Sequence, residues 1–193
     1  MISIGNDIVD LKDNDSDLIT YHNRFFSRVL ADEEYRFLID NRSNKIEKKM
    51  FWTVWAIKEA AYKAIKRIDD KAIFQPKKYI VSENFNHVKY QDKKLQCIYD
   101  INEEFIHVIC MNENIKQMKE ENKIRYFTEF IDEKKSPGLN VRDRIKDELK
   151  AFYNLDIDLL FKNRVPFYEL KNQKYPVSIS HHGRYIAAAF LVD

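Results

Sequence analysis

The strongest pattern of hydrophobic and polar positions lies between Phe51 and Ile68. Apolar residues recur there at spacings of three and four, which is typical of the buried face of an α-helix, and no glycine or proline interrupts the segment. Glu59 and Lys63 fall on a neighbouring face, so the pattern predicts their charged groups one helical turn apart. The apolar positions of this helix are Val54, Ile57, Ala61, Ala64 and Ile68.

The rest of the first half alternates between helical and strand-like patterns. Residues 2–11 predict a strand whose end presents Asp7. Residues 21–41 predict helix, with acidic residues where a second helix would begin. The polar, basic stretch 41–49 predicts a loop or a frayed helix end. Short runs rich in β-branched and aromatic residues predict strands at 79–81, 87–90, 95–99 and 105–110.

The second half repeats this scheme on a smaller scale, after a highly polar segment at 112–123. We therefore expect an α+β fold of two similar lobes, each a small antiparallel sheet packed against helices, spanning residues 1–118 and 119–193. The patterns of the second half predict a helix at 141–153 and strands at 124–131, 165–170, 177–180 and 185–192.

Composition narrows the classes of function. The formal net charge of +2 disfavours a nucleic-acid-binding protein, which usually carries a strong basic excess. The apolar run at 186–192 is too short to span a membrane, and the N-terminus lacks the pattern of a signal peptide. With only Cys97 and Cys110 present, we expect two reduced thiols, each half-buried on a strand, in a cytoplasmic protein.

The segment Gly5-Asn6-Asp7 places a carboxylate at the end of the first predicted strand. A carboxylate fixed in this way suits Mg²⁺, which prefers one or two carboxylates with water and substrate phosphate oxygens as its other ligands. Taken alone, the motif is more often a turn glycine followed by a solvated or capping aspartate.

The segment from Trp55 to Lys63 combines an acid and two bases on the predicted helix. Glu59 could supply a metal ligand or a base, while Lys58 and Lys63 could hold phosphates. The alternative is a plain surface pair between Glu59 and Lys63, worth about 0.2–0.5 kcal/mol. Aromatic residues and alanines surround the pair, which favours a partly buried Glu59 in need of a partner.

The segment Ser178-Ile179-Ser180-His181-His182-Gly183 is an alternating strand that ends in hydrogen-bond donors suited to a phosphate. Ser180 and His181 make a poor nucleophile and base, because neighbours on a strand point to opposite faces. The alternative for the two histidines is ordinary loop surface.

Together, these three segments resemble the 4′-phosphopantetheinyl transferase superfamily. Its members carry Gly-x-Asp, Trp/Phe-x-x-Lys-Glu-Ala-x-x-Lys and Ser-x-Ser-His, which here correspond to residues 5–7, 55–63 and 178–181. Residues 24–30, with Glu34 after them, are also similar to the family's segment that follows its Asp motif. Residues 162–168 resemble its Gly-Lys-Pro stretch.

The order of the motifs resembles that of the short holo-acyl-carrier-protein synthases, whereas the length is closer to that of the two-lobed surfactin-type enzymes. This combination implies a permuted pseudodimer with the active site between its lobes. A monomer is favoured, and the alternative is a trimer like that of the short synthases.

The resemblance implies a magnesium-dependent transfer of 4′-phosphopantetheine from coenzyme A to a serine of an apo acyl or peptidyl carrier protein, with release of 3′,5′-adenosine bisphosphate. Asp7 and Glu59 would hold Mg²⁺. Lys63 and Lys58 would bind phosphates, and Ser180 with His181 would contact the 3′-phosphate. Glu59 and Lys63 are the candidate catalytic groups, with Glu59 as the base for the carrier serine.

Two positions depart from the family pattern. Surfactin-type enzymes have a second acid where this chain has Val9, and Asp10 is out of register with it. The lysine of Gly-Lys-Pro is replaced by Val165, so the neighbouring Arg164 is the candidate phosphate contact in its place.

Partners follow from the same resemblance. We expect coenzyme A and an acidic carrier protein, with Arg24 and Arg28 as candidates for carrier docking, and neither nucleic acid nor membrane. The alternative function is a non-enzymatic module of the same fold that binds coenzyme A or the carrier protein. A nucleotide- or RNA-binding role for residues 41–49 is disfavoured by the near-neutral charge.

Overall fold

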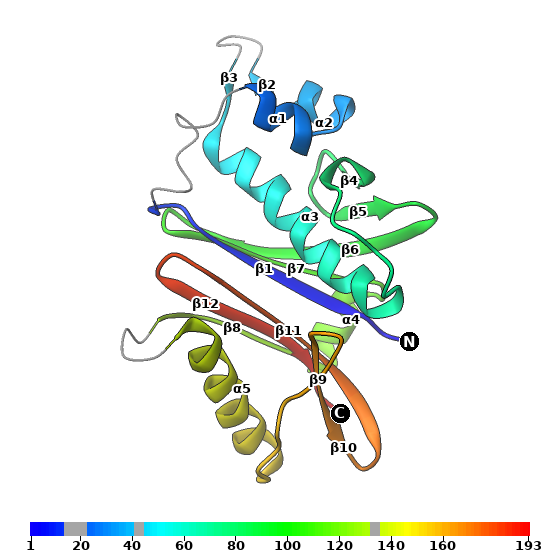
Figure 1. Ribbon diagram of the computed structural model, residues 1–193, viewed down its shortest axis with the longest axis vertical. Coiled ribbons are helices and arrows are strands. Elements are labelled where there is room, and N and C mark those ends of the chain that lie inside the picture. Colours follow the sequence, from blue (N-terminus) through cyan, green and yellow to red (C-terminus); the bar gives the residue numbers. More distant parts are fainter. Residues whose placement is uncertain (14–22, 41–44, 132–135) are drawn as a thin grey trace.

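A computed structural model describes residues 1–13, 23–40, 45–131 and 136–193, and its strands form two five-stranded antiparallel sheets and one short two-stranded ribbon in these ranges (Figure 1). The first sheet has the strand order β1-β7-β6-β5-β4, with β1 at one edge. Its strands are β1 (Ile4–Asp10), β7 (Phe105–Met111), β6 (Lys93–Ile101), β5 (His87–Tyr90) and β4 (Tyr79–Val81).

The second sheet has the order β8-β12-β11-β10-β9. It consists of β8 (Ile124–Phe130), β12 (Tyr185–Leu191), β11 (Gln173–His182), β10 (Val165–Leu170) and β9 (Leu160–Lys162). The predicted strands of both halves are therefore confirmed. The segment at 162–168 also contains a hairpin, because β9 and β10 pair across it.

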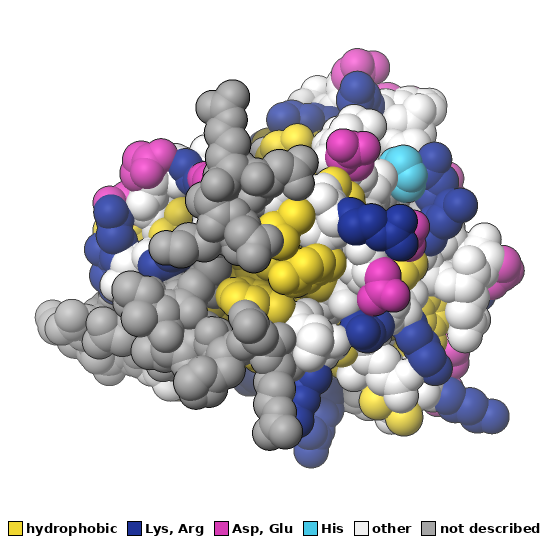
Figure 2. Space-filling model, turned by 90° about the horizontal axis from the view of Figure 1, so that it is seen from above, with side chains coloured by type: hydrophobic (Ala, Val, Ile, Leu, Met, Phe, Trp, Pro, Cys, Tyr) yellow, Lys and Arg dark blue, Asp and Glu magenta, His cyan; other side chains and the backbone are white. Residues whose placement is uncertain are grey.

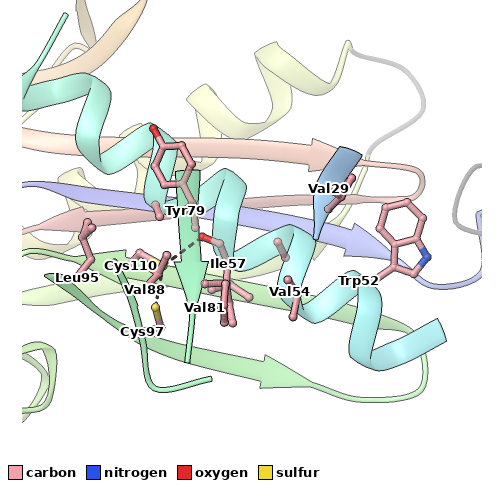
Figure 3. Packing of buried hydrophobic residues seen from close by; sticks show 14 of the residues in the cluster. Val29, Trp52, Val54, Ile57, Tyr79, Val81, Val88, Leu95, Cys97 and Cys110 are labelled. Carbon is pink, nitrogen blue, oxygen red and sulfur yellow. Dashed lines mark hydrogen bonds between the residues drawn. The ribbon is translucent and has the colours of Figure 1, made fainter. Parts of the chain in front are cut away.

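One long helix covers each sheet. In Figure 1, α3 (Lys48–Ile68), the first sheet, the second sheet and α5 (Pro137–Tyr153) follow one another as layers. Figure 3 shows part of the core between α3 and its sheet, where Val54 and Ile57 of the helix meet Val81 and Val88 of the strands. The expected α+β fold of two similar lobes is confirmed.

The smaller elements lie mostly at one end of the first lobe. These are α1 (Asn23–Val29), α2 (Asp32–Leu38), β2 (Ile39–Asp40), β3 (Lys45–Ile46) and the 3₁₀ turn η3 (Pro76–Lys78). The stretch 41–49, predicted as a loop or a frayed helix end, differs at 45–46, where β3 pairs with β2, and at 48–49, where α3 has already begun. Residues 21–22 and 41–44 lie outside the described residues.

A short helix, α4 (Ile115–Glu120), interrupts the polar segment between the lobes. The Asn114 side chain accepts a hydrogen bond from the Gln117 amide at 3.3 Å, and Ile115 is buried. One apolar anchor and one cap thus form a helix turn in a segment with no helical periodicity. The predicted lobe boundary falls inside α4. No helix among the described residues is long and apolar enough to cross a membrane.

Cys97 and Cys110 are cross-strand partners on β6 and β7, with their sulfur atoms 3.1 Å apart. Both are free thiols and both are buried, so the expectation of half-buried thiols is wrong. Burial raises the pKa of Cys110, and its Sγ donates a 3.6 Å hydrogen bond to the Ile57 carbonyl of α3 (Figure 3). The pair packs as two small apolar side chains beneath the helix.

β1 is buried on both faces, and its residues alternate between the two lobes. Ile4 joins the core of the second lobe, Asn6 bonds to β11, and Ile8 packs against β12. The residues between them face α3: Asp7 bonds to this helix, and Val9 joins the core beneath it. A shift of one residue along β1 would exchange these two sets.

Gly5 allows β1 to approach the α3 backbone closely. A Cβ atom at this position would overlap the Ala60 carbonyl oxygen and the Ala64 nitrogen, which are backbone atoms that cannot rotate away. Ala60 and Ala64 are themselves fully buried. The glycine therefore sets the separation between β1 and the face of α3 that carries Glu59 and Lys63.

We predict that Gly5→Ala destabilises the protein by about 3 kcal/mol or more, because the added methyl group must push helix and strand apart. Chemical denaturation followed by circular dichroism measures this change. Gly138→Ala is the matched control, since nothing lies within 4 Å of a Cβ there and alanine favours the α5 helix. A Gly5→Ala variant as stable as wild type would contradict the close packing.

Candidate active site

Asp7 and Lys63 meet where β1 crosses α3. The Lys63 Nζ donates hydrogen bonds to Asp7 Oδ1 at 2.8 Å and to the Asn6 carbonyl oxygen at 2.9 Å. Both side chains are partly exposed, with 13% of the Asp7 and 29% of the Lys63 side chain accessible, so solutes can reach the pair. Residues 56 positions apart in the sequence thus form one charged site.

Glu59 lies one helical turn before Lys63 and is partly buried. Burial and the negative charge of Asp7 raise the pKa of Glu59 to about 7, and the positive charge of Lys63 opposes them without cancelling them. The site therefore contains two carboxylates whose repulsion a single ammonium does not offset.

This donor set suits Mg²⁺. Two carboxylates with excess negative charge match the preference of Mg²⁺ for one or two protein carboxylates plus water and phosphate oxygens. No cluster of three or more His, Cys, Asp or Glu side chains suited to a metal occurs in the described ranges of the chain. Asp7 and Glu59 would be the protein ligands of the ion, with water and phosphate oxygens as the others.

The model of the 4′-phosphopantetheinyl transferase superfamily matches residues 3–110, a span that includes Asp7, Glu59 and Lys63. The chain belongs to this superfamily. The match ends before the second lobe.

Among solved structures, a synthase is similar to this chain. The crystal structure of Thermotoga maritima holo-[acyl-carrier-protein] synthase has 15% sequence identity, with 84% of this chain and 79% of that chain covered and a TM-score of 0.37. A search among curated proteins gave no match.

Lys58 differs from the superfamily role expected for it. Its side chain is fully buried, and its Nζ donates to Glu34 Oε2 at 2.6 Å and to the Pro76 carbonyl at 3.0 Å. Burial lowers the pKa of Lys58, and the Glu34 carboxylate opposes that shift. The expected phosphate contact is therefore wrong: Lys58 is enclosed in the core, where it ties α3 to α2 and η3.

Glu34 completes this buried pair. Its Oε1 accepts from the Val81 amide at 2.8 Å, and its Oε2 accepts from the Ala31 amide at 2.8 Å as well as from Lys58. The similarity to the family's segment after its Asp motif includes Glu34, but it does not predict the pairing of Glu34 with Lys58. Loss of one member of such a pair would cost about 3–5 kcal/mol, because the other charge would stay buried alone.

Ser180 and His181 do not converge on one ligand. The Ser180 Oγ faces β1, where it accepts a 2.9 Å hydrogen bond from Asn6 Nδ2, and only 6% of the residue is exposed. His181 is exposed on the opposite face of β11. The expected contact of both residues with the 3′-phosphate stays a prediction. His182 shares the β1 face with Ser180, and its Nδ1 accepts a hydrogen bond from the Asp10 amide at 3.0 Å.

Arg164 lies in the turn between β9 and β10, exposed and with a left-handed φ of 66°. A cavity of about 520 Å³ opens beside this turn, and Lys162 and Asn163 line it whereas Arg164 does not. The expected phosphate contact of Arg164 therefore stays a prediction. The cavity lies between the lobes, and its basic lining residues are Lys66, Arg67, Lys162 and Lys174.

Arg67 is a buried member of this cavity that the sequence did not predict. Its Nε donates to the Ile4 carbonyl at 2.8 Å and its Nη1 to the Pro166 carbonyl at 2.9 Å, which joins the two lobes. Burial lowers the pKa of Arg67 to about 10, and no carboxylate pairs with it in the part of the chain that the structure describes. A guanidinium of this kind favours an anion in the cavity.

Asp10 points away from the site, as its register predicts. Its fully buried carboxylate accepts from Arg184 Nε at 2.8 Å and Arg184 Nη2 at 2.9 Å. Burial alone would raise the pKa of Asp10. The hydrogen bonds from Arg184 and Lys12 outweigh this effect, so the pKa is lowered to about 2. Asp10 thus binds the β11–β12 turn and is no substitute for the acid missing at Val9.

We predict that Glu59→Gln stabilises the metal-free protein at pH 8 by about 1–2 kcal/mol. The folded-state pKa of about 7 exceeds the ordinary value of 4.5, so ionisation of Glu59 destabilises the fold progressively as the pH rises between these values. Glutamine escapes this effect, and the difference disappears below pH 4.5. Denaturant titrations with a chelator present, at pH 8 and below pH 4.5, measure this difference in the free energy of unfolding.

The exposed Glu113→Gln controls for the loss of one negative charge. A Glu59→Gln variant that is less stable than wild type at pH 8 would contradict the electrostatics described above.

Proposed function

We propose that the chain transfers 4′-phosphopantetheine from coenzyme A to a serine of an apo acyl or peptidyl carrier protein. The observation that carries this proposal is the convergence of Asp7, Glu59 and Lys63 from β1 and α3 at a partly exposed site. These are the positions at which the superfamily motifs match. Phosphoryl-type transfer needs charge stabilisation and positioning above all, and this set supplies both.

Lys63 would bind the pyrophosphate of coenzyme A. Its Nζ already lies against an acid and a carbonyl, so it is held in one position and can stabilise negative charge on a phosphate without reorganising. Asp7 and Glu59 would hold Mg²⁺, which when bound would neutralise charge on the phosphate oxygens.

The nucleotide end of coenzyme A would occupy the cavity of about 520 Å³ between the lobes. Lys66 and Arg67 line it one helical turn beyond Lys63, so a ligand bound to Lys63 can extend into it. Its basic groups suit the phosphates, and Phe167 and Tyr175 offer apolar surface for a base.

Glu59 would accept the proton of the carrier serine, directly or through a water. The serine oxygen then forms a bond to the β-phosphorus as the bond from that phosphorus to the bridging oxygen breaks. The leaving group is 3′,5′-adenosine bisphosphate. A carboxylate with its pKa raised to about 7 is a stronger base than an ordinary glutamate.

The carrier protein would dock near the α1–α2 end of the first lobe. Figure 2 views this end, where exposed hydrophobic side chains lie beside lysines and arginines. Arg28 is exposed at the end of α1, which suits an acidic helix, while the side chain of Arg24 lies outside the described residues. A cytoplasmic setting agrees with the free thiols Cys97 and Cys110.

We predict that the purified chain, with Mg²⁺ and coenzyme A, adds the mass of phosphopantetheine to an apo carrier protein. Asp7→Asn and Glu59→Gln should each lower kcat/KM at least about 100-fold, because each removes a charge that the transfer uses. Intact-mass spectrometry of the carrier measures the reaction, and Glu113→Gln is the control variant.

The outcomes separate the two candidate functions. Coenzyme A binding in calorimetry without any mass gain on carriers of fatty acid, polyketide and peptide synthesis would favour the binding module. An active Asp7→Asn, Glu59→Gln double variant would assign the chemistry to other residues.

We also predict a monomer, because both lobes that enclose the proposed site belong to one chain. Light scattering after size exclusion should give a mass near 23.3 kDa at all protein concentrations tested. A stable species of three times that mass would favour the arrangement of the short synthases.

A further inference from the structure

A cluster of polar side chains lies at the centre of the interface between the two sheets. Asn6 of β1 is fully buried there, with its backbone amide 2.8 Å from Ser178 Oγ and its Nδ2 2.9 Å from Ser180 Oγ. The same Nδ2 lies 3.1 Å from His107 Nε2, and His107 Nδ1 lies 3.0 Å from Thr128 Oγ1. The cluster therefore joins β1 and β7 of the first lobe to β11 and β8 of the second.

The surroundings of this cluster are apolar. Ile4 and Ile8 flank Asn6 on the same face of β1, and both are buried. Apolar contacts alone would allow the sheets to slide over each other, whereas hydrogen bonds hold only in one register. One acceptor, Asn6 Oδ1, has no partner among the described residues, so the cluster also costs free energy. The cluster is therefore better explained as a means of specifying one register between the two sheets than as a source of stability.

The cluster is linked directly to the catalytic candidates. The carbonyl of Asn6 accepts the 2.9 Å hydrogen bond from Lys63, and Asp7 is the next residue along β1. A second anchor holds β1 three residues further on, where Asp10 binds Arg184 and His182. Asp7 therefore lies between two attachments of β1 to the second lobe.

We propose that Asn6, His107, Ser178 and Ser180 form a register lock between the lobes, and that Ser180 is a positioning residue which holds Asp7 and Lys63 through Asn6. The catalytic part of this inference rests on the proposed transfer. It assigns the serines of the Ser-x-Ser-His segment to the scaffold, in contrast to a direct contact with the 3′-phosphate.

The two roles predict different kinetics for Ser180→Ala. A positioning role lowers kcat about tenfold, because the reacting groups are misplaced, and leaves the KM for coenzyme A unchanged. It also lowers turnover of 3′-dephospho-coenzyme A in the same proportion. A phosphate contact would instead raise the KM for coenzyme A and leave the 3′-dephospho analogue unaffected.

A second measurement tests the lock without catalysis. Ser178→Ala removes the acceptor of the Asn6 amide, so hydrogen exchange of the β1 peptide should become at least about tenfold faster. Ser82→Ala removes a hydroxyl from the turn after β4, outside the interface, and should change neither kinetics nor β1 exchange.

Equal losses of kcat with both substrates, together with faster β1 exchange, support the lock. A selective rise in KM for coenzyme A, or variants with wild-type kinetics and exchange, would overturn it. If the wild-type chain transfers nothing, the transfer proposal fails on its own, and the exchange measurement still decides whether the lock exists.

Discussion

The packing of the structure depends on β1, because neither face of this strand is exposed to solvent. Every second residue of β1 packs against the second lobe, and the residues between them pack against α3. Gly5 brings the strand against the backbone of the helix, and Asn6 fastens it to β11. Because both faces are used, β1 has one register, and the position of Asp7 follows from it.

Two lysines on the same helix, α3, differ strongly in burial. Lys58 and Lys63 are five residues apart, yet Lys58 is enclosed with Glu34 while 29% of the Lys63 side chain remains exposed. The first therefore joins α2 and η3 to α3, whereas the second stays accessible to solvent. The Glu59 carboxylate lies between these extremes, buried enough that its pKa is raised to about 7.

Periodicity was enough to predict α3, α5 and most strands, because long amphipathic runs reflect burial that neighbours along the chain share. The grouping of Asp7, Glu59 and Lys63 was predictable only from the family resemblance. The roles of Lys58 and Ser180 were not, since each depends on a partner far away in the sequence. Ser180 meets Asn6 across 174 positions, and no local pattern encodes such a contact. Arg67 gave no signal at all, because its partners are backbone carbonyls.

The continuous chain through α4 has a consequence for how the two lobes come together. A site shared between separate subunits is lost on dilution, because its halves must find each other in solution. Here the linker keeps the second sheet within a short distance of β1, which corresponds to an effective concentration on the order of millimolar. Packing of the two lobes against each other is therefore a unimolecular folding step, and their interface can be partly polar without dissociating at low protein abundance.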